Sequence, residues 1–223
     1  MRFGLVSATL VVLLGTGAAV AEGLAGPYLA GRAAGLASDY GAAADYTAQA
    51  LTQDPTNARL LDSGILSFID LGQPDKALVL ARQAETIDQP MPAAQLLLLA
   101  DQAKSGDFEG MLTRLGKPTG LGPLESRILT AWAIYGAGRM SEAQAELDRA
   151  ATEPGMAAFT LYHKALMFAA AGDFESAEAL LADPTAVSMA QSRRGMMAHV
   201  QILSQLERGP DALALIDKVY GPR

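Results

Sequence analysis

The sequence predicts an all-α fold, a solenoid of about six helix-turn-helix repeats. A turn-forming segment recurs six times in the 223 residues, and successive copies begin 34, 34, 32, 34 and 35 residues apart. The copies begin at Ser38, Gly72, Gly106, Gly138, Gly172 and Glu207. A fixed period near 34, with helical patterns on both sides of a short turn, is the signature of such a solenoid. No segment of useful length alternates with period two, which argues against strands.

Each repeat is expected to contain a first helix, a turn and a second helix. The repeats span about 24–57, 58–91, 92–122, 123–157, 158–191 and 192–221. Small residues are needed where the two helices meet. Such residues occur on the first helices at Gly31, Ala131 and Ala165. On the second helices the matching residues are Ala43, Ala77, Ala143, Ala177 and Ala212, with Met111 in the third repeat. The turn glycines permit the left-handed conformation that ends a helix.

Helix starts and repeat joins also have recognisable residues. A short acidic side chain at a helix start accepts hydrogen bonds from free backbone N–H groups. The residues in such places, at or near the starts of second helices, are Asp39, Asp75, Asp107 and Asp173. The joins between repeats are marked by Pro55, Pro92, Pro123 and Pro154. None of these prolines falls inside a predicted helix, which supports the assigned boundaries.

The best-formed repeats have a detailed sequence pattern. In the first repeat, the run 39–55 closes on Ala50-Leu51 and then Asp54-Pro55. The second repeat keeps the pattern at Gly64, Ile65, Phe68, Leu71, Gly72, Ala77, Ala81, Ala84 and Asp88. This pattern resembles the tetratricopeptide repeat family, over about 24–221. The resemblance implies a right-handed α-solenoid. The chain departs from the pattern at Pro118, where a closing alanine is expected, and at Glu207, where a turn glycine is expected.

Two segments interrupt the predicted stack. The segment 116–123 contains Gly116, Pro118, Gly120, Gly122 and Pro123, and it cuts the second helix of the third repeat short. It is either a hinge between halves at 24–115 and 123–221 or a longer ordered loop. The segment 182–184 shortens the second helix of the fifth repeat.

Residues 1–21 are expected to be a signal peptide rather than part of the solenoid. Arg2 gives a positive start, residues 3–14 form an apolar run, and Ala19-Val20-Ala21 is a cleavage signal that predicts a mature start at Glu22. A retained membrane anchor is the alternative, but the run is shorter than the roughly 18 residues that span a bilayer. The sequence therefore predicts an exported protein without a stable membrane span after cleavage. The lack of cysteine favours the periplasm, with secretion as the alternative.

Composition and motifs exclude several functions. A net charge of −7 argues against nucleic acid and anionic membrane surfaces as partners. No phosphate-binding loop or nucleophile elbow occurs. The two histidines, His163 and His199, have no spacing that brings metal ligands together. The acidic pair Glu142 and Glu146 is expected on a solvated helix face. We expect no enzyme activity, no metal and no cofactor.

The resemblance implies that function lies on the concave surface lined by the first helices. The residues expected there are Tyr28, Arg32, Asp62, Leu66, Ile69, Leu96, Ala100, Ile128, Trp132, Tyr135, Phe159, Tyr162, Leu166, Met197 and Gln201. The centre of this surface is apolar and aromatic, which suits an extended or helical peptide. Alternatively, Trp132, Phe159 and Tyr162 pack the fourth repeat on the fifth. Because lysine and asparagine are missing from the matching positions, the carboxylate-gripping mode of the family's chaperone-binding members is disfavoured.

The sequence thus predicts a non-catalytic scaffold of the cell envelope that binds a partner protein or peptide. A structural module of a longer protein or an oligomer is a second hypothesis, and a regulatory module for an envelope hydrolase is a third. The final helix, about 211–220, carries an apolar stripe of roughly 160° at 100° per residue. Such a wide stripe indicates self-association through this helix, because a terminal repeat needs a polar outer face.

Overall fold

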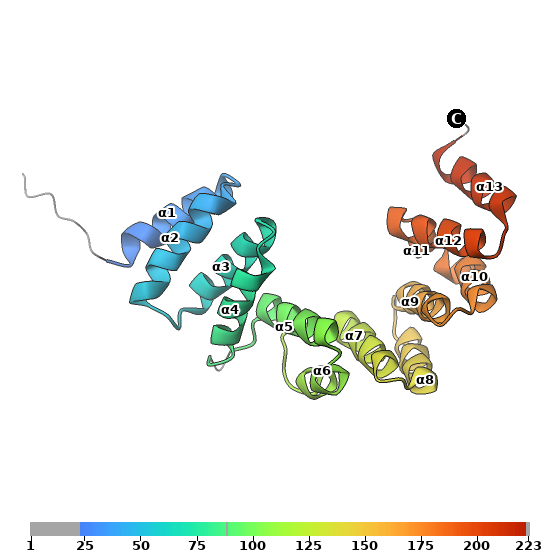
Figure 1. Ribbon diagram of the computed structural model, residues 1–223, viewed down its shortest axis with the longest axis horizontal. Helices are drawn as coiled ribbons and strands as arrows, with labels where there is room; N and C mark the ends of the chain where they lie inside the picture. The colour runs from blue at the N-terminus through green and yellow to red at the C-terminus, as the bar shows by residue number, and fades with distance from the viewer. Residues whose placement is uncertain (1–22, 88, 222–223) are drawn as a thin grey trace, which may run out of the picture.

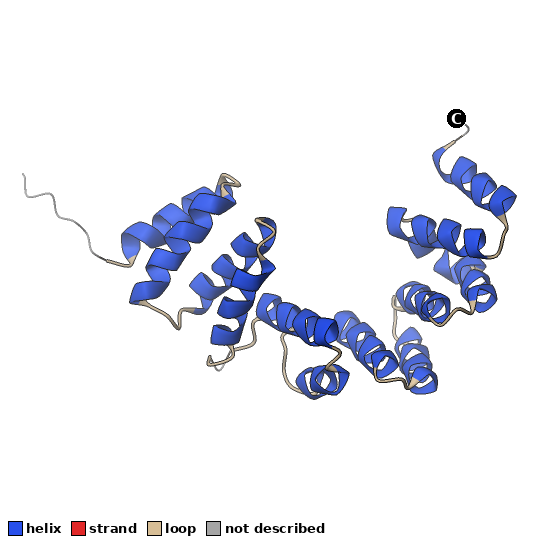
Figure 2. Ribbon diagram, viewed as in Figure 1, coloured by secondary structure: helices blue, strands red, loops and turns tan. Residues whose placement is uncertain are grey.

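The computed structural model describes residues 23–87 and 89–221, and these residues form helices and loops without a strand (Figure 2). The helices follow one another along a curved path, with α1 and α2 at one end and α13 at the other (Figure 1). The predicted all-α solenoid of helix-turn-helix repeats is confirmed. The predicted signal peptide at 1–21 lies outside the described residues.

The helices alternate between first and second members of successive pairs. The first helices are α1 (Ala25–Leu36), α3 (Ala58–Asp70), α5 (Pro92–Ser105), α7 (Pro123–Gly136), α9 (Ala157–Ala170) and α12 (Arg193–Gln205). The second helices are α2 (Tyr40–Gln53), α4 (Pro74–Ala84), α6 (Phe108–Leu115), α8 (Met140–Ala151), α10 (Phe174–Ala182) and α13 (Gly209–Tyr220). Each helix packs on the next along the chain through most of the stack. In Figure 1, α6 and α8 lie on the outer side of the curve.

The turns within the pairs have the left-handed conformation that the glycines predicted. Gly72, Gly106, Gly138 and Gly172 have φ angles between 67° and 86°. Ser38 and Glu207 take the same conformation with φ of 59°, although each carries a Cβ. A non-glycine residue in this region costs roughly 1–2 kcal/mol. The repeat geometry therefore holds even where the turn residue is unfavourable.

The four aspartates lie at or near the starts of second helices, as predicted: three are helix caps, and Asp75 lies in the first turn of α4. Asp39, Asp107 and Asp173 each accept a hydrogen bond of 3.0 Å from the backbone N–H three residues later. The hydrogen bond from Ser176 lowers the pKa of Asp173. Each cap satisfies a free N–H group at the start of a second helix.

Small residues fill the contact between paired helices, as the sequence pattern indicated. The pattern residues on the second helices are all buried: Ala43, Ala77, Met111, Ala143, Ala177 and Ala212. On the first helices, a Cβ added at Gly64 would lie only 2.6 Å from Leu80 Cδ1. A Cβ added at Gly31 would lie 3.3 Å from Thr47 Oγ1. The helices therefore pack closely enough to favour glycine at these two places.

The two interruptions differ in structure. After the short helix α6, residues 116–122 form a loop in which Thr119 is buried. A Cβ added at Gly120 would lie 3.0 Å from Pro90 Cβ and 3.1 Å from Pro92 Cγ, so the loop packs closely on the join before α5. These contacts favour the ordered-loop alternative over a hinge.

The second interruption contains helical structure that the sequence pattern did not predict. A 3-10 turn, η1 (Pro184–Ala186), and a short helix, α11 (Val187–Ala190), lie between α10 and α12. Both pack against α9. A Cβ at Gly195 would collide with the Met189 carbonyl oxygen, so glycine allows α12 to approach α11 closely. This extra turn of structure covers part of α9.

Candidate functional site

The first helices expose apolar side chains at several of the predicted groove positions. Leu66 and Ile69 on α3 are 47% and 42% exposed, and Leu96 on α5 is 44% exposed. Further along, Phe159 on α9 is 37% exposed and Met197 on α12 is 60% exposed. Exposed apolar side chains that recur on four of the first helices form a surface that a partner could cover. We call these five residues the apolar row.

The remaining predicted groove residues have mixed environments. Arg32, Ala100 and Gln201 are exposed. Half-buried positions are Tyr28, Asp62, Ile128, Trp132, Tyr135 and Leu166. Tyr162, expected as a groove residue, is only 8% exposed and packs in a core cluster with Ala165, Ala177 and Ile202. Met189 of α11 contributes to the same cluster. Tyr162 is therefore a packing residue, because the unpredicted elements η1 and α11 pack against α9.

Trp132 takes part in an aromatic cluster that links α7 to α9. Its Nε1–H donates a 3.0 Å hydrogen bond to Nδ1 of His163. The Trp132 ring meets Tyr135 edge to face at 5.6 Å between centroids, and His163 meets Tyr162 at 5.3 Å. Burial lowers the pKa of His163, which favours the neutral ring that can accept this hydrogen bond. This arrangement supports the packing alternative for Trp132.

The partnership of Trp132 with His163 was not predicted. The two residues lie 31 positions apart, so neighbouring repeats bring them close together. A separation close to one repeat was the only sign in the sequence that Trp132 and His163 could meet. Many other residue pairs in a repeat protein have a similar separation.

Charged residues of the fourth repeat also form an internal network. Glu146 on α8 is buried, with 7% exposed, and pairs with Arg127 at 2.9 Å and with Arg149. Arg127 also pairs with Glu153 at 3.2 Å. Burial acts to raise the pKa of Glu146, but the two guanidinium groups outweigh it and hold the pKa below its usual value. The expectation that Glu146 lies on a solvated face is wrong, because Arg127 from α7 covers it.

A cavity of about 410 Å³ lies between α9 and α12 at one end of the stack. Leu166, Phe174, Ala198 and Ile202 give it apolar walls, and Gln201 and Gln205 give it polar groups. Its volume falls within the range of about 300–1,000 Å³ of pockets that hold a ligand or an anchor side chain.

A smaller cavity of about 230 Å³ lies at the other end, between α1 and α3. Tyr28 and Arg32 of α1 line it together with Arg59, Leu60 and Ser63 of α3, and Thr47 of α2 completes the lining. The guanidinium of Arg59, and then that of Arg32, lower the pKa of the Tyr28 phenol. The sequence did not predict a role here for Arg59, Thr47 or Ser63, because the expected groove positions lie on one face of each first helix.

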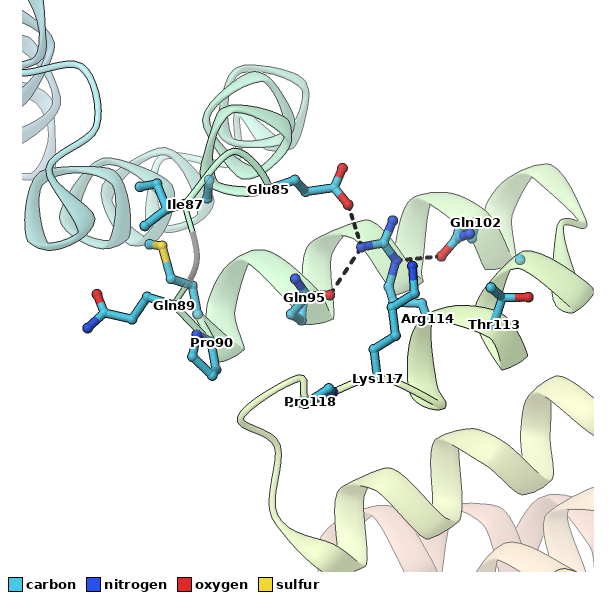
Figure 3. Close-up of a pocket in the computed structure, with 13 residues that line it drawn as sticks. Glu85, Ile87, Gln89, Pro90, Gln95, Gln102, Thr113, Arg114, Lys117 and Pro118 are labelled. Carbon is cyan, nitrogen blue, oxygen red and sulfur yellow. Dashed lines mark hydrogen bonds and ion pairs between the residues drawn. The ribbon is translucent and has the colours of Figure 1, made fainter.

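A third cavity, of about 510 Å³, lies where the second repeat joins the third (Figure 3). Arg114 of α6 reaches across it, donating to Glu85 at 2.8 Å, Gln95 at 3.1 Å and Gln102 at 2.9 Å. Figure 3 shows Lys117 and Pro118 on one side of this cavity. Because Gln95 and Gln102 lie on α5 and Glu85 directly follows α4, Arg114 holds α6 against α5 and against the end of α4. This network was not predicted.

Neither histidine has the surroundings of a metal ligand. Among the described residues, no group of three or more histidine, aspartate or glutamate side chains gathers to hold a metal ion. His199 is buried on α12, with its Nε2 3.8 Å from Glu178 Oε1, and burial lowers its pKa.

The last helix is only partly covered. Ala212 is buried against α12, whereas Leu213 and Tyr220 are 65% and 61% exposed. Within the described residues, no helix has both the length and the apolar character that a membrane crossing requires.

Comparisons with known proteins bear on the fold. No protein-family model matches the chain, and no curated protein matches it. YrrB, described as a TPR protein with an unusual peptide-binding site, superimposes with a TM-score of 0.58 at 14% identity, over 78% of this chain and 88% of YrrB. MamA superimposes with a TM-score of 0.53 at 14% identity, over 81% of this chain and 96% of MamA. The chain therefore has the fold of a tetratricopeptide-repeat solenoid.

Proposed function

We propose that the protein is a non-catalytic scaffold that binds a partner protein through the apolar row on its first helices. The observation that carries this proposal is the exposure of Leu66, Ile69, Leu96, Phe159 and Met197 on the first helices α3, α5, α9 and α12. Each exposed apolar side chain gains free energy when a partner removes it from water, at about 25 cal/mol per Å². The likeness to YrrB supports the same proposal, since that protein is described as having a peptide-binding site.

The preferred partner segment is an extended or helical peptide with apolar anchors spaced to match successive repeats. Cavities at both ends of the row give such a segment places to anchor. We place this binding in the cell envelope, on the strength of the signal-peptide pattern in residues 1–21.

The test compares two surfaces of the same protein. Wild-type protein is used to capture partners from an envelope extract, alongside Leu66→Ser/Leu96→Ser. Val79→Ser is the matched control, because Val79 is an exposed apolar residue on the second helix α4. The double variant should capture at least about tenfold less of a partner that binds the apolar row, and the control should capture as much as the wild type. Equal capture by all three proteins would contradict the proposal.

A second candidate is self-association through α13. It is favoured by the exposure of Leu213 and Tyr220 on the outer side of that helix. Light scattering at several concentrations should show a mass that rises with concentration in the wild type. Leu213→Ser/Tyr220→Ser should remain monomeric, and a wild type that is monomeric throughout would exclude this candidate.

A further inference from the structure

The cavity between α1 and α3 has an unusual lining for an acidic protein. Five of its six lining residues carry hydrogen-bond donors at the side chain: Tyr28, Arg32, Thr47, Arg59 and Ser63. The sixth, Leu60, is apolar, so no carboxylate among the described residues lines the cavity. The whole chain has a net charge of −7, and this cavity is a local exception with two guanidinium groups.

Most arginines of the described chain, six of ten, pair with a carboxylate, whereas Arg32 and Arg59 have no carboxylate partner among the described residues. The ion pairs of residues 23–87 and 89–221 use Arg82, Arg114, Arg127, Arg139, Arg149, Lys164 and Arg208. Arg32 and Arg59 do not appear among them. Both side chains are exposed, and both line this one cavity together with Tyr28.

We propose that Tyr28, Arg32 and Arg59 form a binding site for a single oxyanion group, a carboxylate or a phosphate, carried by the partner. Arginine offers a planar fork of N–H donors that matches both groups. The phenol and the hydroxyls of Thr47 and Ser63 supply further donors. At about 230 Å³ the cavity has room for one such group of a larger molecule. Tyr28 and Arg59 also line a second cavity of about 740 Å³, which gives the rest of the molecule space.

The site deepens the proposed function and rests on it for the identity of the partner. Tyr28 and Arg32 lie on α1, and Arg59 lies at the start of α3, the helix that carries Leu66 and Ile69. An anionic group bound here would fix one end of a segment that then passes along the apolar row. The site thus sets the direction in which the partner lies, which apolar contacts alone define poorly.

The test uses inorganic phosphate and acetate as probes of the wild-type protein, so it needs no partner. Thermal unfolding is followed with each anion against chloride at equal ionic strength. A ligand that binds only the folded state raises the melting temperature as its concentration increases. We expect a saturable rise with phosphate, acetate or both. Which anion is effective identifies the group as phosphate or carboxylate.

Arg32→Gln/Arg59→Gln should weaken the binding of the effective anion by at least about tenfold, because each lost guanidinium removes a charge-assisted hydrogen bond. Arg82→Gln is the matched control, since Arg82 is an exposed arginine on α4 that pairs with Asp101. If the double variant does not fold, Tyr28→Phe provides a smaller change that should weaken binding and leave the fold intact.

The proposal is overturned if neither anion shifts the melting temperature relative to chloride, or if the arginine variants and Tyr28→Phe respond as the wild type does. Either result leaves the apolar row untouched, because partner capture is measured separately. Conversely, the wild type could bind the anion while the apolar-row variant still captures the partner. That result would support this site and contradict the proposed function.

Discussion

Tyr28 and Tyr162 occupy matching places on the first helices of the first and fifth repeats, yet their environments are opposite. Tyr28 is half-buried beside Arg59 and Arg32, whose guanidinium groups lower its pKa. Tyr162 is 8% exposed, and burial raises its pKa. The same residue at the same place in a repeat thus lines an open cavity at one end and fills the core near the other. Exposure in this solenoid is decided by neighbouring segments rather than by position in the repeat.

The neighbouring segments explain the difference. Around Tyr162, the short elements η1 and α11 pack against α9, and Met189 joins the cluster that buries the ring. The polar groups of the adjacent repeat are also partnered, as Glu146 with Arg127 and Trp132 with His163 show. Around Tyr28, the donor groups lack carboxylate partners among the described residues. The polar groups of the α7–α9 region are therefore closed off by internal contacts, whereas those of the α1–α3 region are available to a ligand.

The largest expected effect tests whether the α7–α9 region is closed in this sense. Tyr162→Ala should lower the free energy of unfolding by about 3–5 kcal/mol, the usual cost of truncating a large buried side chain. Tyr28→Ala should cost about 1 kcal/mol, because the ring is only half-buried. Urea unfolding measures both. Equal losses of unfolding free energy in the two variants would show that Tyr28 and Tyr162 are equally important for packing.

How far the sequence predicts this molecule depends on which features repeat. The turns, the aspartate caps and the buried alanines recur with the period, so the pairing of helices could be predicted from one chain. The cover over Tyr162 could not, because residues 184–190 form short elements after the shortened helix α10, in one repeat alone. Its short elements leave no apolar period long enough to recognise.

The candidate site was predictable to a similar extent. The inward positions of the first helices are what the resemblance to the tetratricopeptide repeat family implies, and five of them are exposed apolar residues. Which of the remaining positions are open depends on contacts between different repeats. Arg59 illustrates this limit, because it reaches the cavity from the start of α3 rather than from the predicted inward face.

A second and smaller effect concerns the buried ion pair of the closed region. Glu146→Gln should destabilise the protein by about 1–3 kcal/mol at neutral pH, since it removes the charged partner of Arg127 and Arg149. The pKa of Glu146 is lowered in the folded state, so its stabilising contribution is present above the unfolded pKa of about 4.3 and is lost as the pH falls through the folded pKa. The difference in stability between the wild type and Glu146→Gln should therefore shrink in acid.

Glu142 supplies the control for this measurement. It lies one turn earlier on α8, its side chain is 63% exposed, and it pairs with Arg139 at 3.6 Å. Glu142→Gln should change the stability by less than about 0.5 kcal/mol, because exposed ion pairs contribute little. If Glu142→Gln lowers the stability as much as Glu146→Gln does, then the buried ion pairs of Glu146 contribute no more than an exposed pair. The contrast with the first repeats would then be weakened.

The smallest effect is the most direct measure of the contrast, because it compares the two tyrosines by a single property. An ordinary tyrosine has a pKa of about 10. Tyr28 should ionise below that value, because Arg59 and Arg32 stabilise the phenolate, and Tyr162 should ionise above it, because burial disfavours the charged form. Absorbance titrations of the wild type minus Tyr28→Phe, and minus Tyr162→Phe, separate the two groups. Salt distinguishes the causes: at about 1 M the Debye length is about 3 Å, so salt should raise the pKa of Tyr28 towards its ordinary value and leave that of Tyr162 unchanged. A Tyr28 that titrates normally at low salt would mean that the two guanidinium groups do not converge on the phenol.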